Sequence, residues 1–253
     1  MKGQKRKKIS PSAYHKRNYR QAVSAGDMVS SFVRVKETDL HILAAENIEA
    51  EAYHFVHRYR NQLENYITAH PDFLTALVPL EHDPLAPAIV KAMLKAGTAA
   101  NVGPMAAVAG AVAECVGLDL IKVSPEIIVE NGGDIFIHAA RELKISIFAG
   151  DSPLSLKIGL ELPSKSTPRA VCTSSGTIGH SLSAGRADAV SVLSSSCALA
   201  DAVATAVANR VRTPKEIQKA IEWGRRIPGV EGLLVILGED LGAWGQVKIV
   251  PLS

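Results

Sequence analysis

Asp201 and Thr205 are the residues of this chain best suited to holding a cation. They lie four positions apart in a small, apolar stretch that runs from residue 196 to residue 209. Positions i and i+4 of a helix share one face, so the carboxylate and the hydroxyl point the same way. Oxygen ligands of this kind suit a hard cation such as Mg2+. Alternatively, Asp201 offsets the helix dipole and Thr205 bonds back to a carbonyl group of its own helix.

A turn between two apolar stretches is a second candidate. It reads Glu130-Asn131-Gly132-Gly133-Asp134. The two glycines supply the positive φ angles of a tight hairpin turn, so we predict a central hairpin over residues 126–137. Glycine backbone also lets a ligand approach closely. We therefore predict that Asn131, Gly132, Gly133 and Asp134 bind a cofactor, with the turn facing a cavity near Asp201.

The stretch from Gly97 to Pro104 is predicted to be a glycine-rich loop that enters a helix. Backbone N–H groups at such a position can bind an anion. The spacing matches neither the P-loop nor the dinucleotide fingerprint. The predicted cofactor-binding residues of this loop are Asn101 and Gly103.

The residues from Cys172 to His180 are predicted to be a polar loop after a short strand. They contain no GxSxG elbow and no protease motif, so a nucleophile is not predicted here. We interpret the loop as a ligand-contact segment, in which His180 is the credible acid–base group. The residues predicted to contact the cofactor are Thr173, Ser174, Ser175 and Gly176.

Composition narrows the class of protein. The 253 residues are 47% hydrophobic but only 5% aromatic, which disfavours stacking platforms for single-stranded nucleic acid. Residues 1–20 carry eight basic side chains and no acidic one, leaving 20 basic and 25 acidic groups in the rest of the chain. The formal net charge of +3 therefore comes from a basic leader, and the body is mildly acidic. We predict that the leader is disordered and solvated, and that neither nucleic acid nor a membrane is a partner.

Compartment and targeting can also be inferred. No signal-peptide pattern follows the leader, and no stretch reaches about 18 uninterrupted apolar residues, so neither secretion nor a membrane span is expected. Three widely spaced cysteines form neither a disulfide framework nor a zinc motif. We predict a cytoplasmic protein.

The elements that would position these residues alternate between strands and small-residue helices. Residues 28–45 read as a hairpin and residues 46–69 as a helix that stops before Pro71. Asp83-Pro84 is predicted to start a second helix, Gly97 to end it and Pro104 to start a third. Apolar strands then dominate. This pattern indicates a layered α/β (α+β) fold, with residues 21–253 as one domain.

Taken in order, these motifs resemble the ApbE-type flavin transferases. The matching segments are Gly97–Val108, Asn131–Asp134, Thr173–Gly176 with His180, and Ala200–Ala206. The likeness covers roughly residues 85–210, and its last motif is the most specific. The resemblance implies an ApbE-like fold, FAD as ligand, Mg2+ held by Asp201 and Thr205, and transfer of FMN to a protein hydroxyl as the parent activity.

The chain also departs from the family pattern. The family's A-K-G-Y-A-x-D stretch corresponds to Asn101–Met105, which lacks its lysine, tyrosine and aspartate, and the H-x-x-D-P stretch at His180 lacks its aspartate. Members of the family are typically exported or lipid-anchored. We therefore expect a cytoplasmic branch that binds a flavin or a nucleotide diphosphate with Mg2+, related to the FMN transferases. The alternative is a non-catalytic flavin-binding, nucleotide-binding or assembly protein with the same fold, and any acceptor protein is left open.

Overall fold

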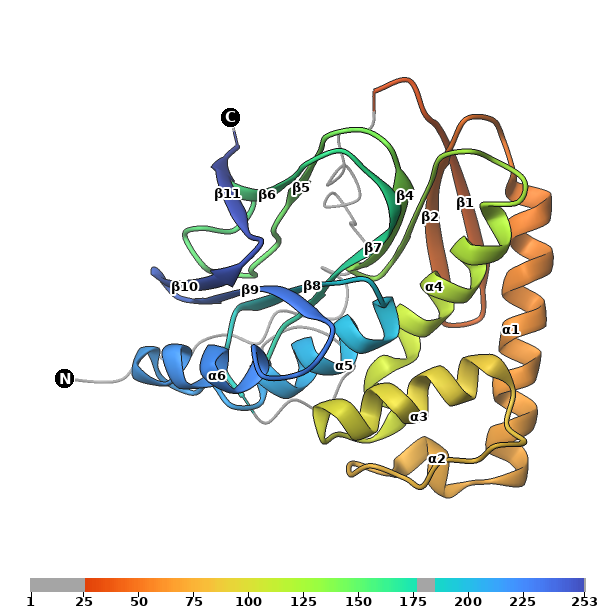
Figure 1. Ribbon diagram of the computed structural model, residues 1–253, viewed down its shortest axis with the longest axis horizontal. Helices are drawn as coiled ribbons and strands as arrows, with labels where there is room; N and C mark the ends of the chain where they lie inside the picture. The colour runs from red at the N-terminus through yellow and green to blue at the C-terminus, as the bar shows by residue number, and fades with distance from the viewer. Residues whose placement is uncertain (1–25, 177–184, 253) are drawn as a thin grey trace.

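The computed structural model describes residues 26–176 and 185–252, which form two sheets and a layer of helices (Figure 1). The predicted basic leader and His180 lie outside the described residues. Among the described residues, no single helix is long and apolar enough to cross a membrane. The helical segments Ala88–Ala100 and Pro104–Leu120 reach the necessary length and apolar composition only when they are taken together, and they are bent by 105° relative to each other.

The first half of the described chain is a hairpin followed by helices. Its elements are β1 (Val29–Val35), β2 (Thr38–Ala44), α1 (Glu49–Ala69), α2 (Asp72–Thr75), α3 (Ala88–Ala100), the 3-10 helix η3 (Pro104–Ala107) and α4 (Val108–Leu120). The second half is mainly strands. Its elements are β3 (Ile127–Asn131), β4 (Asp134–Ala139), β5 (Leu143–Ser146), β6 (Ile158–Leu162), β7 (Lys165–Ser174), β8 (Ala189–Ser194), α5 (Cys197–Ala208), the 3-10 helix η4 (Pro214–Glu216), α6 (Ile217–Gly224), β9 (Val230–Leu237), β10 (Asp240–Gly245) and β11 (Lys248–Pro251).

The strands form an eight-stranded sheet and a three-stranded sheet. The large sheet has the order β1-β2-β3-β4-β7-β8-β9-β10, and the small one the order β11-β6-β5. All neighbouring strands pair antiparallel. The predicted hairpin over residues 126–137 is confirmed as β3 and β4, in the middle of the large sheet.

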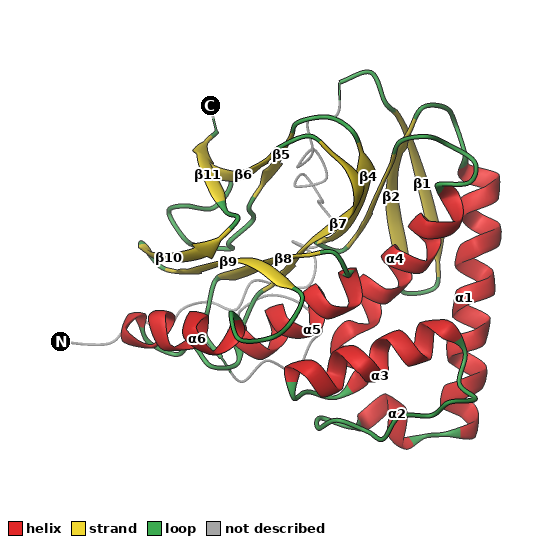
Figure 2. Cartoon of the chain, viewed as in Figure 1, coloured by secondary structure: helices red, strands yellow, loops and turns green. Residues whose placement is uncertain are grey.

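The large sheet is covered on both faces, by the helices on one side and by the small sheet on the other (Figure 2). Side chains of a strand point alternately to its two faces. In β4, Phe136 packs in the helix-side core, while Ile135 and Ile137 pack in the core shared with the small sheet. Asp134 has the parity of Phe136, so its carboxylate lies on the helix side of the sheet.

Small residues set the distance between the helices and this face. A Cβ added to Gly117 of α4 would lie 2.2 Å from the ring of Phe136, so only glycine lets the helix approach so closely. Burying a phenylalanine side chain of this kind contributes roughly 2–3 kcal/mol. The abundance of alanine and glycine is thus explained by close helix–sheet packing.

The layered α/β class is confirmed, but two predicted helix boundaries are wrong. Asp83-Pro84 starts no helix: the Asp83 carboxylate accepts the N–H of Leu85 at 2.8 Å in a turn. Helix α3 begins after Pro87, because a residue that precedes a proline disfavours helical angles. Gly97 does not end this helix either, which continues to Ala100.

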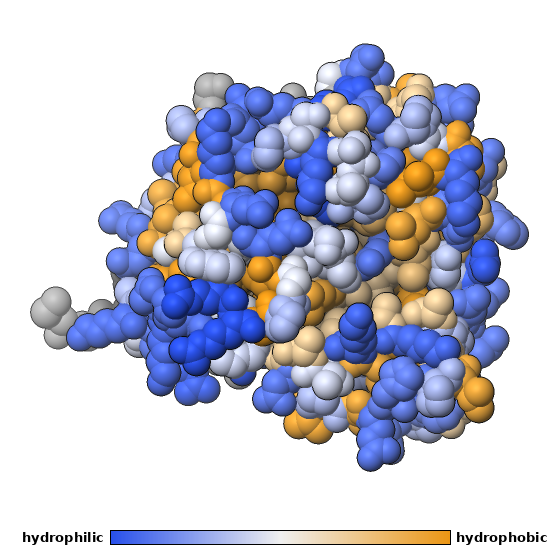
Figure 3. Space-filling view, in the orientation of Figure 1, coloured by the Kyte–Doolittle hydropathy of each residue, from blue (hydrophilic) through white to orange (hydrophobic). Residues whose placement is uncertain are grey.

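Hydrophobic side chains are exposed on the segment that follows α2. Leu77 is 69% exposed and Leu85 is 92% exposed. Figure 3 shows hydrophobic residues along the lower edge of this face, where α2 and its loop lie in Figure 1. Single exposed apolar side chains of this kind are common on protein surfaces.

Candidate metal and nucleotide site

Helix α5 brings Asp201 to the start of α4. The predicted helix is confirmed, and the side chain of Ser196 caps it by accepting the N–H of Leu199. Asp201 Oδ2 accepts the backbone N–H of Gly110 at 2.9 Å. The first N–H groups of a helix have no partner within it. Asp201 therefore caps a neighbouring helix, whereas the sequence suggested a role at the start of its own.

The two helices cap each other. Glu114 of α4 reaches the start of α5, where its Oε2 accepts the N–H of Ala198 and the hydroxyl of Ser196, both at 3.0 Å. A Cβ added to Gly110 would lie 2.4 Å from the carbonyl oxygen of Cys197, so glycine is required for this approach. The helix pair holds Asp201 in a fixed position.

The β3–β4 turn lies against the same helix start. The Asn131 side-chain amide donates to the carbonyl of Ala109 at 3.0 Å. Gly132 and Gly133 both have positive φ, at 67° and 112°, as the Gly-Gly pair predicted. A Cβ added to Gly132 would meet nothing within 4 Å, so this edge of the turn is open.

The carboxylate of Asp134 is affected by that of Asp201. Burial and the nearby Asp201 carboxylate raise the pKa of Asp134 well above its usual value. Burial likewise raises the pKa of Asp201 to about 7, although the N–H groups of Gly110 and Ala109 act in the opposite direction. Two carboxylates in such surroundings are costly to ionise together, and either a bound proton or a bound cation relieves this cost.

The raised pKa values of Asp134 and Asp201 predict that the free energy of unfolding depends on pH. Asp201 has a pKa of about 7 in the folded state and near 3.8 in the unfolded state, so between these values the folded chain binds more protons. Its contribution to the free energy of unfolding therefore falls as the pH rises from about 4 to about 7. Asp134 acts in the same direction.

The measurement is urea unfolding of the parent and of Asp201→Asn at about pH 5 and about pH 8. We expect the parent to lose more stability than the variant at the higher pH, because the amide does not titrate. Mg2+ should restore stability to the parent mainly at the higher pH. Equal pH slopes in the two proteins would contradict this prediction.

The side chains of this region carry oxygen atoms of the kind that bind a hard cation. Asp134, Asp201 and the buried Thr205, one turn after Asp201, offer carboxylate and hydroxyl oxygens, the ligands that Mg2+ prefers. Among the described residues, no group of three or more His, Cys, Asp or Glu side chains is placed to hold a metal. The protein would thus fill part of an octahedral shell, leaving positions for water or phosphate oxygens.

The predicted polar loop after Cys172 is partly wrong. Thr173 and Ser174 are the last residues of β7, a strand longer than expected, because they pair with Ser191 and Val190 of β8. The Thr173 N–H donates to the carbonyl of Gly133 at 3.2 Å, which places the strand end beside the β3–β4 turn. Gly176 follows the strand and donates its N–H to the carbonyl of Ala187. The prediction for His180 falls on residues that are not described.

The predicted glycine-rich loop is shorter than expected. Asn101 is exposed and ends α3 in the left-handed conformation, with φ 54°. A Cβ added to Gly103 would lie 1.8 Å from the carbonyl oxygen of Ala76, so this glycine allows close contact between chain segments. Pro104 then starts η3, as predicted, and η3 leads directly into α4.

Sequence reasoning missed two features of the site. It did not assign the capping role of Glu114. It also did not foresee that the thiols of Cys172 and Cys197 meet, with their Sγ atoms 3.5 Å apart in the core. The Cys172 thiol also donates to the carbonyl of Cys197 at 3.3 Å. The alternation of side chains along β4 and β7 could have indicated that Cys172 faces the helix side, because Cys172 pairs with Asp134 across these strands.

The fold is that of the ApbE flavin transferases. The flavinyl transferase ApbE from Pseudomonas stutzeri is similar with a TM-score of 0.58 and 13% identity, over 86% of this chain and 93% of that chain. The ApbE protein from Thermotoga maritima is similar with a TM-score of 0.55 and 13% identity, over 85% and 96%. The resemblance expected from the motifs is confirmed at the level of fold.

Closer relatives are found among archaeal proteins. A UPF0280 protein from Methanococcus aeolicus is 38% identical over 226 residues, which cover 87% of this chain and 91% of the relative. A UPF0280 protein from Methanopyrus kandleri is 40% identical over 233 residues, covering 89% and 94%. A family profile described as "AbpE bacteria" matches residues 20–246. The chain belongs to this family.

Proposed function

We propose that this protein binds a flavin nucleotide together with Mg2+ at the start of α4. The observation that carries the proposal is the arrangement at the start of α4, where the Asp201 carboxylate accepts the N–H of Gly110 and Asn131, in the turn that leads to Asp134, donates to the carbonyl of Ala109. The structural neighbours named flavin transferases support a flavin as the ligand. The N–H of Gly110 at the start of α4 already donates to Asp201, so the phosphates would be held through the cation rather than by the helix start.

Each predicted residue has a role in this proposal. Asp201 and Thr205 hold Mg2+, which when bound neutralises the charge of a pyrophosphate. The turn from Asn131 to Asp134 and the segment from Thr173 to Gly176 bind the nucleotide, because hydrogen bonds hold the strand end beside the turn. Asn101 and Gly103 precede η3 and complete the nucleotide contacts, and His180 is the proposed acid–base group. We further propose a cytoplasmic location.

The test is a titration of metal-free, flavin-free protein with FAD, followed by flavin fluorescence and calorimetry, with and without Mg2+. We expect binding that strengthens at least roughly tenfold when Mg2+ is present, since the metal joins carboxylates and phosphates. ADP should show the same dependence on Mg2+ more weakly, whereas riboflavin, which lacks phosphate, should not. Binding of FAD that ignores Mg2+ would overturn the proposed function.

A second candidate function is FMN transfer to a threonine hydroxyl. We expect no detectable transfer, because Asn101–Met105 lacks the lysine, tyrosine and aspartate of the family stretch. The experiment incubates the protein with FAD, Mg2+ and a threonine-containing acceptor, and detects covalent flavin by in-gel fluorescence. An ApbE flavin transferase with its own acceptor is the positive control. Efficient transfer that is lost in His180→Ala would contradict this expectation and show an enzyme.

A further inference from the structure

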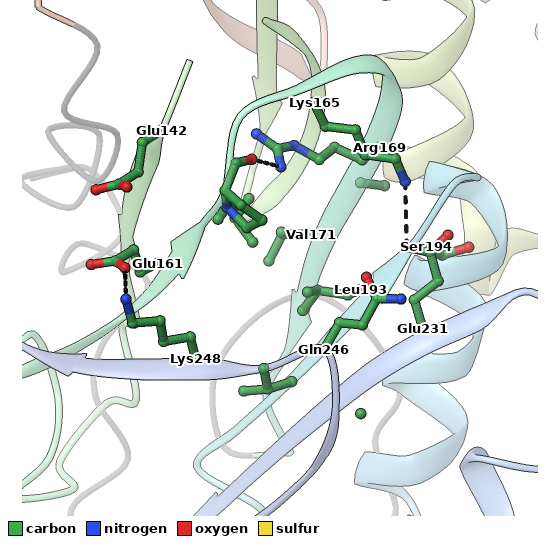
Figure 4. Close-up of a pocket in the computed structure, with 15 residues that line it drawn as sticks. Glu142, Glu161, Lys165, Arg169, Val171, Leu193, Ser194, Glu231, Gln246 and Lys248 are labelled. Carbon is green, nitrogen blue, oxygen red and sulfur yellow. Dashed lines mark hydrogen bonds and ion pairs between the residues drawn. The ribbon is translucent and has the colours of Figure 1, made fainter. Parts of the chain in front are cut away.

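A cavity lies on the other side of the large sheet from Asp201. Its volume is about 510 Å³, and it opens between β7 and the small sheet (Figure 4). Its apolar lining includes Val171 and Leu193, which belong to the core shared by the two sheets. This volume is in the usual range for a site that binds a small molecule.

Arg169 is a buried cation in the wall of this cavity. The residue is only 7% exposed. One terminal nitrogen of its guanidinium donates to the carbonyl of Pro163, and the other donates to the carbonyl of Arg141 over a long 3.4 Å. Its buried Nε has no hydrogen-bond partner among the described residues. A buried guanidinium stays charged, so a position of this kind is costly without an anion.

The two lysines of the cavity lining, unlike Arg169, lie beside acidic side chains. Lys248 pairs with Glu161, and Lys165 lies 3.7 Å from Glu231. Glu142 lies beside Glu161 and Lys248 in Figure 4, away from the guanidinium. No ion pair joins Arg169 to an acidic side chain within the described parts of the chain. Burial lowers the pKa of Arg169, and no described carboxylate opposes this effect.

We propose that this cavity binds a small organic acid, with its carboxylate on Arg169 and its apolar body against Val171 and Leu193. The planar guanidinium suits a carboxylate, and the terminal nitrogen whose bond to the Arg141 carbonyl is long, at 3.4 Å, is the donor available to the ligand. Lys165 and Lys248 already have acidic partners, so Arg169 is the cation of the lining that is left for a ligand carboxylate. The site is separate from the proposed flavin site.

The test compares two probes of equal shape on the full-length parent protein. Hexanoate carries the carboxylate, and hexanamide is its neutral counterpart. Calorimetry and thermal melts should show that hexanoate binds at least roughly tenfold more tightly than hexanamide, because only hexanoate pairs with the guanidinium. Equal binding of the two probes, or binding of neither at millimolar concentration, would overturn the proposal. Tighter binding of inorganic phosphate than of hexanoate would overturn the assignment of an organic acid.

Variants then tie the effect to Arg169. Arg169→Met removes the charge and keeps a long apolar side chain, so it should abolish the preference for hexanoate over hexanamide. Arg169→Lys keeps the charge but loses the planar guanidinium, so it should retain only part of the preference. Lys165→Gln is the matched control, since Lys165 already has an acidic partner, and it should bind hexanoate as the parent does. Binding of FAD with Mg2+ should be unchanged in all three variants. A preference that survives in Arg169→Met would contradict the proposal.

Discussion

Asp201→Asn should weaken Mg2+-dependent binding of FAD by at least roughly tenfold, or about 1.4 kcal/mol. The substitution keeps the size of the side chain and one oxygen acceptor, so the cap on Gly110 is largely preserved. It removes the charge that attracts the cation. Thr205→Val should have a smaller effect, because a neutral hydroxyl contributes less to binding a divalent cation than a carboxylate does.

Glu114→Gln is the matched control for this prediction. Glu114 caps the start of α5 much as Asp201 caps α4, but it is not among the proposed ligands. Its amide keeps one oxygen acceptor, so the melting temperature should fall only slightly, and binding of FAD and Mg2+ should be unchanged. If Asp201→Asn behaves like Glu114→Gln, with a lower melting temperature and unaltered binding, Asp201 is a structural cap and the metal site should be abandoned.

Gly110→Ala should be among the most destabilising single substitutions in the helix layer. The added Cβ would lie 2.4 Å from the Cys197 carbonyl oxygen and 2.8 Å from Asp201 Cβ. The first of these contacts is with backbone, so the two helices would have to move apart. We expect a loss of about 3 kcal/mol in the free energy of unfolding, which is the upper part of the usual range for overpacking.

The measurement is chemical unfolding and a thermal melt, where about 3 kcal/mol corresponds to a decrease of roughly 10 °C in a domain of this size. Gly132→Ala is the control, because its Cβ would meet nothing within 4 Å and only its positive φ is strained. That strain should cost about 1–2 kcal/mol. A Gly110→Ala protein no less stable than Gly132→Ala would show that the helix contact is not close-packed.

The sequence alone determined the local features of this protein. The periodicity of residues 196–209 predicted the helix that carries Asp201 and Thr205, and Asn131-Gly132-Gly133 predicted a tight turn. Both follow from rules that act over a few residues, namely helical spacing and the positive φ that glycine tolerates. The order of the motifs also indicated the ApbE-like fold, which the structural neighbours confirm.

Long-range packing decided the rest. Asp201 meets the N–H of Gly110, 91 positions away in sequence, and no local pattern predicts that pairing. Gly97 stays helical, although glycine disfavours helices by up to about 1 kcal/mol, because α3 is held by the buried residues around it. The strand β7 extends to Ser174 because β8 supplies its hydrogen bonds. Local propensity contributes less to the stability of these elements than buried contacts and backbone pairing do. Those contacts depend on which distant segments the fold brings together.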